Sequence, residues 1–430
     1  MMLDRTIQPA IRNLERFEIQ RPECIVMPNG IPVYILDAGS TDVVRIDVVM
    51  GGGRWHQLQP LQALFTNRML REGSASYTGA AIAEQLDYYG AWLDLSSAPM
   101  NTYVTLYSLN KYLPQTLPLL ASIVTEPVFP EKELALVVEN NIQSFLNNCS
   151  KVGFLAHRAL VKAVYGALHP CGKIVQEEDY RKITPDVLRA FYNKYYSSEN
   201  CVVYISGRVT DAGLQQLEKA MGERTFGHEF QKPSLPVFNP SPSTDKRVFV
   251  EHTTAMQSAV RMGMLWPDRN HPDFLKLRVL LTLFGGYFGS RLMSNIREDK
   301  GYAYNISASI LSYPDTGLMV ISADTANEYV EDLISEVYRE MDCLRQTDVS
   351  EQELDMVKNY MLGDFCRSYE SAFSLADAWI LLHEAGLPQD YYIASLDAIR
   401  SITPAEMRRL SEEYFDSTKL KETVVGRKIS

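Results

Sequence analysis

The hydrophobic residues of this chain recur with two different periods, and the two periods alternate along the sequence. Segments with alternating or continuous apolar residues predict strands, at 24–27, 31–36, 43–50, 92–97, 101–109 and 200–205. Segments with apolar residues three and four positions apart predict helices, at 58–70, 78–89, 113–124, 131–146 and 152–165. An Asn-Gly pair between the first two strands predicts a tight hairpin turn. The pattern therefore indicates a protein that mixes helices with strands.

The same order of elements begins again in the second half of the chain. The Ile-Thr-Pro sequence at 183–185 recurs 219 positions later at 402–404, and the pattern Glu-x-Glu-Leu-x-x-Val at 131–137 recurs 220 positions later. We interpret this recurrence as a tandem duplication of one α+β unit. A stretch with four prolines, at 231–244, is typical of a linker. The predicted boundaries are 1–227 for the N-terminal unit, 228–245 for the linker and 246–430 for the C-terminal unit.

A stretch in the second half, residues 284–304, combines glycines with a short helix and a strand. Three apolar residues between 292 and 296 fall on one side of the predicted helix, and Gly301 is expected to end it. Alternating residues then predict a strand. Arg297 lies near the end of that helix and Tyr304 lies on the strand, so the two side chains could converge. One interpretation is structural, with Arg297 at a helix C-terminus and Tyr304 in packing; the other is a ligand-binding pair.

Composition and charge limit the kinds of molecule that this chain is expected to bind. The 430 residues carry 42 basic and 53 acidic side chains, and basic residues adjoin only in pairs. This balance argues against nucleic acid and anionic membrane as partners. The six cysteines are scattered without a C-x-x-C motif, which is typical of a reducing compartment. The first twenty residues lack an apolar core, so we expect no signal peptide, no membrane span and a cytoplasmic location.

Four short motifs carry a resemblance to a known family. They are Met-Pro-Asn-Gly-Ile at 27–31, Ser-Arg-Leu at 290–292, Arg-Glu at 297–298 and Gly-Tyr-Ala-Tyr at 301–304. Together with the duplication, they resemble the insulinase/pitrilysin-type zinc peptidases, and within them the mitochondrial-processing-peptidase-like branch. The resemblance covers nearly the whole chain. It implies that each α/β unit contains a mostly antiparallel sheet packed with helices.

The resemblance also implies where a zinc site would lie. The family binds zinc through an H-x-x-E-H motif on the first helix of the N-terminal unit, with a further Glu from a later helix. In this chain Leu64 and Arg68 stand in place of the two histidines, and Asn67 replaces the general base. The later ligand falls at Asn140 or Asn141. Because Leu offers no donor and Arg repels a dication, the zinc site is predicted to be degenerate and the chain to hold no metal.

A second implication concerns Arg297 and Tyr304. In bacterial two-chain members of the family, one chain carries the zinc and the other contributes an Arg and a Tyr, which match these two residues. The resemblance thus implies a non-catalytic subunit that binds the peptide backbone opposite the zinc of an H-x-x-E-H partner. Alternatives are a peptidase-derived scaffold, a peptide-binding homodimer with no proteolytic role, and a stand-alone peptidase with a relocated metal.

Overall fold

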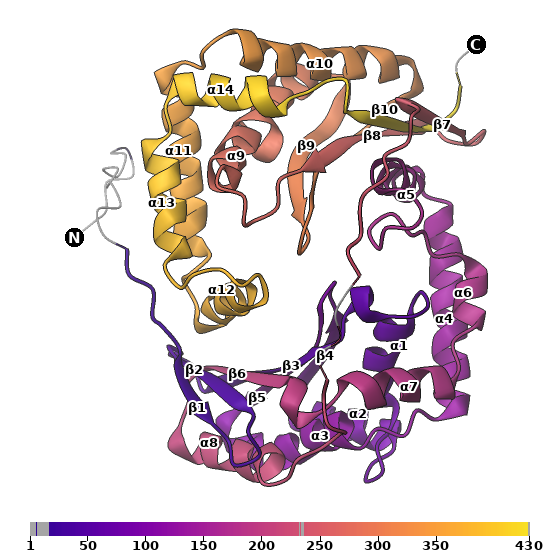
Figure 1. The fold of residues 1–430 in the computed structure, drawn as a ribbon, viewed down its shortest axis with the longest axis vertical. Helices are drawn as coiled ribbons and strands as arrows, with labels where there is room; N and C mark the ends of the chain where they lie inside the picture. The colour runs from indigo at the N-terminus through magenta and orange to yellow at the C-terminus, as the bar shows by residue number, and fades with distance from the viewer. Residues whose placement is uncertain (1–5, 7–16, 232, 234–235, 429–430) are drawn as a thin grey trace.

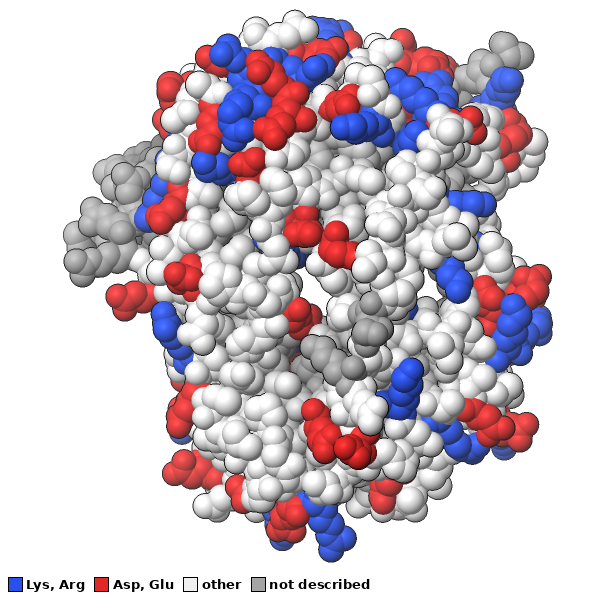
Figure 2. Space-filling model, viewed as in Figure 1, with Lys and Arg blue, Asp and Glu red and all other residues white. Residues whose placement is uncertain are grey.

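The computed structural model describes Thr6 and residues 17–231, 233 and 236–428. Most of the N-terminal stretch in which no signal peptide is expected therefore lies outside the described residues, as do three residues of the predicted linker. The chain forms two halves that face each other (Figure 1). The space-filling view is hollowed between them, and basic and acidic side chains are interspersed over α10 and α14 (Figure 2). No described helix has the length and apolar composition needed to cross a membrane.

The N-terminal half is built on a six-stranded sheet. Its strands, in spatial order, are β1 (Glu23–Val26), β2 (Pro32–Asp37), β6 (Cys201–Gly207), β3 (Val43–Gly51), β5 (Asn101–Leu109) and β4 (Trp92–Ser97). Only β2 and β6 pair in parallel. The predicted hairpin joins β1 and β2, with Gly30 at a φ of +88°. The helices are α1 (Gln62–Arg68), α2 (Gly79–Tyr88), α3 (Leu113–Thr125), α4 (Glu131–Cys149), α5 (Val152–Tyr165), α6 (Glu177–Arg181), α7 (Pro185–Tyr195) and α8 (Asp211–Leu217).

The C-terminal half repeats this arrangement with one strand fewer. Its sheet has the order β7 (Arg247–Glu251), β11 (Lys421–Gly426), β8 (Gln257–Trp266), β10 (Gly317–Ala326) and β9 (Ala303–Ser312). Here β7 and β11 are the parallel pair. The helices are α9 (Phe274–Leu281), α10 (Val330–Gln346), α11 (Glu351–Arg367), α12 (Ala372–Glu384), α13 (Tyr391–Ser401) and α14 (Pro404–Tyr414).

The repeat in the sequence corresponds to a repeat in the structure. The order β2-β6-β3-β5-β4 matches β7-β11-β8-β10-β9 strand for strand. Helices α7 and α14 follow Thr184 and Thr403, and each threonine hydroxyl accepts the backbone N–H three residues later, at 3.3 Å. Such N-caps stabilise a helix start. The predicted α+β fold, with two mostly antiparallel sheets packed with helices, is confirmed.

One pair of equivalent helices is exchanged between the halves. α5 belongs to the N-terminal half in sequence, yet it packs on the C-terminal sheet, where the Thr423 hydroxyl donates to the Ala156 carbonyl at 3.0 Å. Its counterpart α12 packs on the N-terminal sheet, with Ile380 against Val49 and Tyr204. Each sheet is therefore covered in part by the other half's helix. Helix α5 lies within the predicted N-terminal unit and α12 within the predicted C-terminal unit, so each unit contributes one helix to the sheet of the other.

Candidate functional site

Helix α1 carries three of the residues that align with the family's zinc motif. It begins at Gln62 rather than near residue 58, because Leu61 has a φ of +71°, a left-handed backbone that a helix does not contain. Leu64 packs against the apolar core of the N-terminal half. Asn67 is buried, and its amide donates to the Tyr103 carbonyl at 3.2 Å. Neither side chain is arranged to activate a water molecule.

Arg68 meets a residue from α4 at the same corner of the fold, which we call the metal corner (Leu64, Asn67, Arg68 and Asn141). Its guanidinium donates to the Asn141 side-chain oxygen, whereas Asn140 is exposed. Of the two positions that the sequence left open, Asn141 therefore lies opposite α1. A cavity of about 360 Å³ adjoins the pair. Burial lowers the pKa of the Arg68 guanidinium; Tyr180 acts in the opposite direction and Arg71 in the same one.

The residues of the metal corner do not fit a zinc ion. Zinc needs deprotonated thiolate, neutral imidazole or carboxylate donors, and the corner offers an alkyl chain, two amides and a cation. Among the described residues, no group of three or more His, Cys, Asp or Glu could hold a metal. His169 and Cys171 form an internal contact instead, since His169 Nδ1 accepts the Cys171 backbone N–H at 3.1 Å and its ring stacks on Tyr165.

The Arg297 segment is a π-helical turn, η7 (Met293–Asp299), that feeds directly into β9. Its apolar side is buried, with Ile296 fully enclosed. Gly301 has a φ of +68° and ends the turn as predicted, and the Tyr302 backbone N–H donates to the Ile296 carbonyl at 2.9 Å. Single π-helical turns recur at functional sites. The turn places Arg297 beside the first residues of β9.

Arg297 and Tyr304 do converge. The Arg297 guanidinium lies 4.6 Å from the centroid of the Tyr304 ring and 4.8 Å from that of Phe288, so it is held between two aromatic faces. Tyr304 is 84% exposed and Phe288 61% exposed. No hydrogen bond or ion pair to a described residue involves the Arg297 guanidinium. The sequence did not indicate the contact with Phe288, because an aromatic residue among glycines has no pattern that predicts it.

Arg291, six residues earlier, shows what a structural arginine looks like in this segment. Its Nε and Nη2 donate to the two oxygens of Glu353 on α11, at 2.7 and 2.9 Å. This bidentate pair fixes the segment to α11 and uses two of the Arg291 N–H donors in a structural contact. Arg297, by contrast, keeps its N–H donors available. A guanidinium between two rings and an exposed phenol can together donate hydrogen bonds to a carbonyl or carboxylate oxygen.

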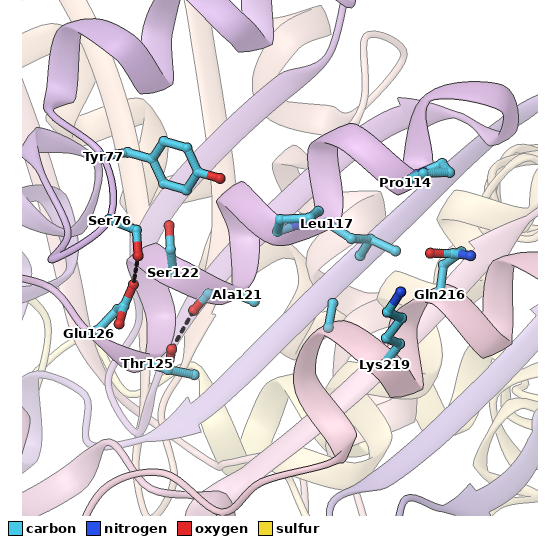
Figure 3. A pocket seen from close by; sticks show the side chains of 12 residues that line it. Ser76, Tyr77, Pro114, Leu117, Ala121, Ser122, Thr125, Glu126, Gln216 and Lys219 are labelled. Atoms are coloured by element: carbon cyan, nitrogen blue, oxygen red, sulfur yellow. Dashed lines mark hydrogen bonds between the residues drawn. The ribbon is translucent and has the colours of Figure 1, made fainter.

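A separate groove of about 410 Å³ lies on the N-terminal half, between α3 and the turn at 218–222 (Figure 3). At one end the Ser76 hydroxyl donates to the Glu126 carboxylate, and Lys219 lies on the opposite wall. Its lining residues include no His or Cys. The groove holds none of the candidate site residues, and its lining has no His that could activate its hydroxyl groups.

Two family models match the chain. The model described as "Insulinase (Peptidase family M16)" matches residues 37–166, and "Peptidase M16 inactive domain" matches residues 182–361. The first contains the metal corner, and the second contains Arg297 and Tyr304. Both matches agree with the resemblance inferred from the sequence motifs.

Individual relatives are more distant. An uncharacterised zinc protease, YmxG, of Bacillus subtilis is 25% identical over 353 residues, which is 80% of this chain and 84% of the relative. A protein of Helicobacter pylori named "non-peptidase homolog YmxG" is 22% identical over 368 residues, 84% of this chain and 83% of the relative. A crystal structure of a peptidase M16 inactive domain from Pseudomonas fluorescens has a TM-score of 0.83 and 22% identity, covering 95% of this chain and 99% of that one. At this identity the structural match establishes the fold alone.

Proposed function

Because the chain belongs to the insulinase family of peptidases, M16, we propose that it is the non-catalytic subunit of a heterodimeric zinc peptidase. In this proposal Arg297 and Tyr304 bind the backbone of a peptide substrate, and a partner chain carrying H-x-x-E-H holds the zinc. One contrast carries the proposal. The metal corner holds no zinc donor, whereas the Arg297–Tyr304 pair is intact, with Tyr304 exposed, Arg297 half-buried and no described carboxylate paired with the guanidinium.

The chemistry assigned to this chain is binding and orientation. Arg297 donates from its guanidinium edge to a peptide carbonyl oxygen, and the Tyr304 hydroxyl donates to the same or a neighbouring oxygen. Phe288 restricts the guanidinium plane, so less rotational freedom is lost on binding. Donors aimed at a carbonyl also favour the negative charge that develops on its oxygen, an effect often worth a few kcal/mol. The chain supplies no general base, since Asn67 stands where the family's glutamate would be.

A role without proteolysis is the second candidate. The Helicobacter pylori relative carries the name "non-peptidase homolog", and the same Arg297–Tyr304 pair could hold peptides in a homodimer without cleaving them. A scaffold role would need neither residue. The cytoplasm is proposed as the compartment, on the scattered cysteines alone.

The test is reconstitution with an H-x-x-E-H chain of the same family from the same genome. Cleavage of a quenched fluorescent peptide is measured for each chain alone and for the mixture. We expect no cleavage by this chain alone and strong cleavage by the mixture. Arg297→Ala should remove most of that activity, while Arg339→Ala, a matched change on the exposed face of α10, should keep it. Cleavage that is undiminished by Arg297→Ala contradicts the proposed role.

A further inference from the structure

The C-terminal half contains its own copy of the corner in which the family's metal would lie. In the N-terminal half that corner is walled by α1, α4 and β4. The corresponding elements of the second half, α9, α11 and β9, wall a cavity of about 630 Å³, which α12 and α13 complete. These elements surround the left-hand side of the central space in Figure 1. The larger cavity is thus the internal counterpart of the metal corner, with different side chains.

Two arginines without acidic partners line this cavity. Arg269 follows β8, and Arg278 lies on α9. Neither guanidinium makes a hydrogen bond or ion pair with a described residue. The Arg269 guanidinium instead lies over the Phe274 ring, 6.0 Å from its centroid. Burial lowers the pKa of the Arg269 guanidinium; Tyr391 opposes that shift and the charge of Arg278 adds to it. Two like charges therefore lie near each other, one on the partly dehydrated Arg269 and one on the exposed Arg278.

The carboxylates in the cavity wall are already engaged elsewhere. Asp364 pairs with Arg367 on the same helix. Asp377 pairs with Arg45 of the N-terminal sheet, at 2.6 Å. Since both acids have their own cation, they do not neutralise Arg269 or Arg278. The positive charge in this cavity is left for a ligand.

A hydroxyl group completes the set of donors. The Tyr391 hydroxyl oxygen is buried, and it has no hydrogen-bond partner among the described residues. Tyr391 lies close enough to both arginines for their charges to oppose the rise in pKa that burial causes in its phenol. A buried polar group without a partner costs stability. An acceptor in the cavity would satisfy this hydroxyl together with the two guanidinium groups.

We propose that this cavity binds an organic carboxylate, with Arg269 and Arg278 as its charged anchors and the Tyr391 hydroxyl as a further donor. A carboxylate fits better than inorganic phosphate, because a carboxylate is carried on a carbon skeleton that the apolar part of the lining can contact. Apolar side chains in the lining, among them Phe365 and Leu382, suit the carbon skeleton of such a ligand. The cavity reaches β9, the strand that carries Tyr304. The source is therefore the acidic side chain or the terminal carboxylate of an extended peptide, a step that rests on the proposed function.

The experiment is calorimetry on this chain alone, with three short peptides of one sequence. The first has a single Glu and an amidated C-terminus, the second has Gln and a free C-terminus, and the third has Gln and an amide. We expect at least one charged peptide to bind about tenfold more tightly than the neutral one. The charged peptide that gains affinity identifies the source of the carboxylate. Arg278→Gln and Arg269→Gln should each remove the difference, and Arg339→Gln should keep it.

Three results would overturn the proposal: equal binding of all three peptides, a difference that survives the Arg269→Gln/Arg278→Gln double variant, or inorganic phosphate binding as tightly as the charged peptides. Glutarate binding as tightly as a charged peptide would support the site and reassign its ligand to a free acid. Arg278 is exposed, so its variant is expected to keep the wild-type melting temperature even if the Arg269 variant does not fold. Because no partner or cleavage enters this measurement, its failure is distinguishable from failure of the peptidase-subunit role.

Discussion

Five strands of each half follow the same order, yet the candidate functional residues of the two halves differ in their exposure and in their partners. In the N-terminal half, the Arg68 guanidinium donates to Asn141 across α1 and α4, and the neighbouring Asn67 is buried. In the C-terminal half, Tyr304 is exposed and Arg297 is half-buried between two rings, and no described residue accepts a hydrogen bond from the Arg297 guanidinium. Two halves with similar backbones can therefore present quite different side-chain chemistry.

The largest effect should come from rebuilding the metal corner. The variant Leu64→His/Asn67→Glu/Arg68→His/Asn141→Glu restores the family's donor set at positions that already converge. We expect it to retain about one equivalent of zinc after dialysis, and the natural chain to retain none. Metal analysis of the purified protein measures this. The control carries Asn140→Glu in place of Asn141→Glu and should bind much more weakly, since the Arg68 side chain meets Asn141 and not Asn140. Equal binding by the control would show that the corner is assigned wrongly.

The next effect concerns catalysis by the reconstituted pair. Arg297→Ala should lower kcat/KM by about 100-fold, because it removes a charged donor to the developing oxyanion. Tyr304→Phe should lower it by about tenfold, because it removes one neutral donor and keeps the ring. Arg68→Ala in the metal corner should leave it within about twofold. Steady-state kinetics of the mixture decides this, and an Arg68 effect as large as that of Arg297 would erase the proposed difference between the halves.

A smaller effect is expected in stability. Arg68→Met should raise the free energy of unfolding by about 1 kcal/mol, because a half-buried cation with only an amide partner is replaced by an apolar chain of similar length. Arg297→Met should change it by less than about 0.5 kcal/mol, since no described carboxylate pairs with this arginine. Denaturant titration of the two variants gives both values. A destabilised Arg68→Met protein would mean that the Arg68–Asn141 contact is a structural clamp.

The smallest effect should appear in the pH dependence of stability. Burial lowers the pKa of His383, whose ring shares a hydrogen bond of 2.6 Å with the Tyr204 hydroxyl where α12 packs on the N-terminal sheet. Between the lowered pKa and about 6.5, the unfolded chain binds more protons than the folded chain, so stability falls as pH falls through that range. Melting temperatures at about pH 7.5 and pH 5.5 should differ less for His383→Gln than for the natural chain. If the difference in melting temperature is the same for His383→Gln, other histidines must cause the pH dependence of stability.

Local features were predictable from the sequence, and features that depend on distant contacts were not. The limits of β4, β5 and α5 and the helix end at Gly301 follow from period and capping, which are local. The start of α1 was misplaced, because the left-handed turn at Leu61 overrides an apolar pattern. Whether Asn140 or Asn141 faces α1 depends on how α4 is rotated, which neighbouring positions in sequence do not reveal.

The same limit applies to the side chains around Arg297. Its convergence with Tyr304 followed from a helix end that feeds a strand. The Phe288 contact did not, because it depends on the path of a glycine-rich loop. The structural use of Arg291 depends on Glu353, which lies on a helix 62 positions away. Both contacts are fixed by tertiary packing rather than by local pattern.

Because α5 and α12 are exchanged, any opening of the central space must involve the contacts between each of these helices and the sheet of the other half. If the halves separate with each exchanged helix staying in its own half, the Ala156–Thr423 and Ile380–Tyr204 contacts must break. If those contacts persist, α5 moves with the C-terminal sheet and α12 moves with the N-terminal sheet. The chain must then bend at the short connections that precede the two helices, at 150–151 and 368–371. Admission of a long substrate would then depend on the stiffness of these two connections. The described end of the proline-rich linker would move with α5, because the Ser241 and Ser243 backbone N–H groups donate to the Tyr165 and Ala163 carbonyls at 2.9 and 2.7 Å.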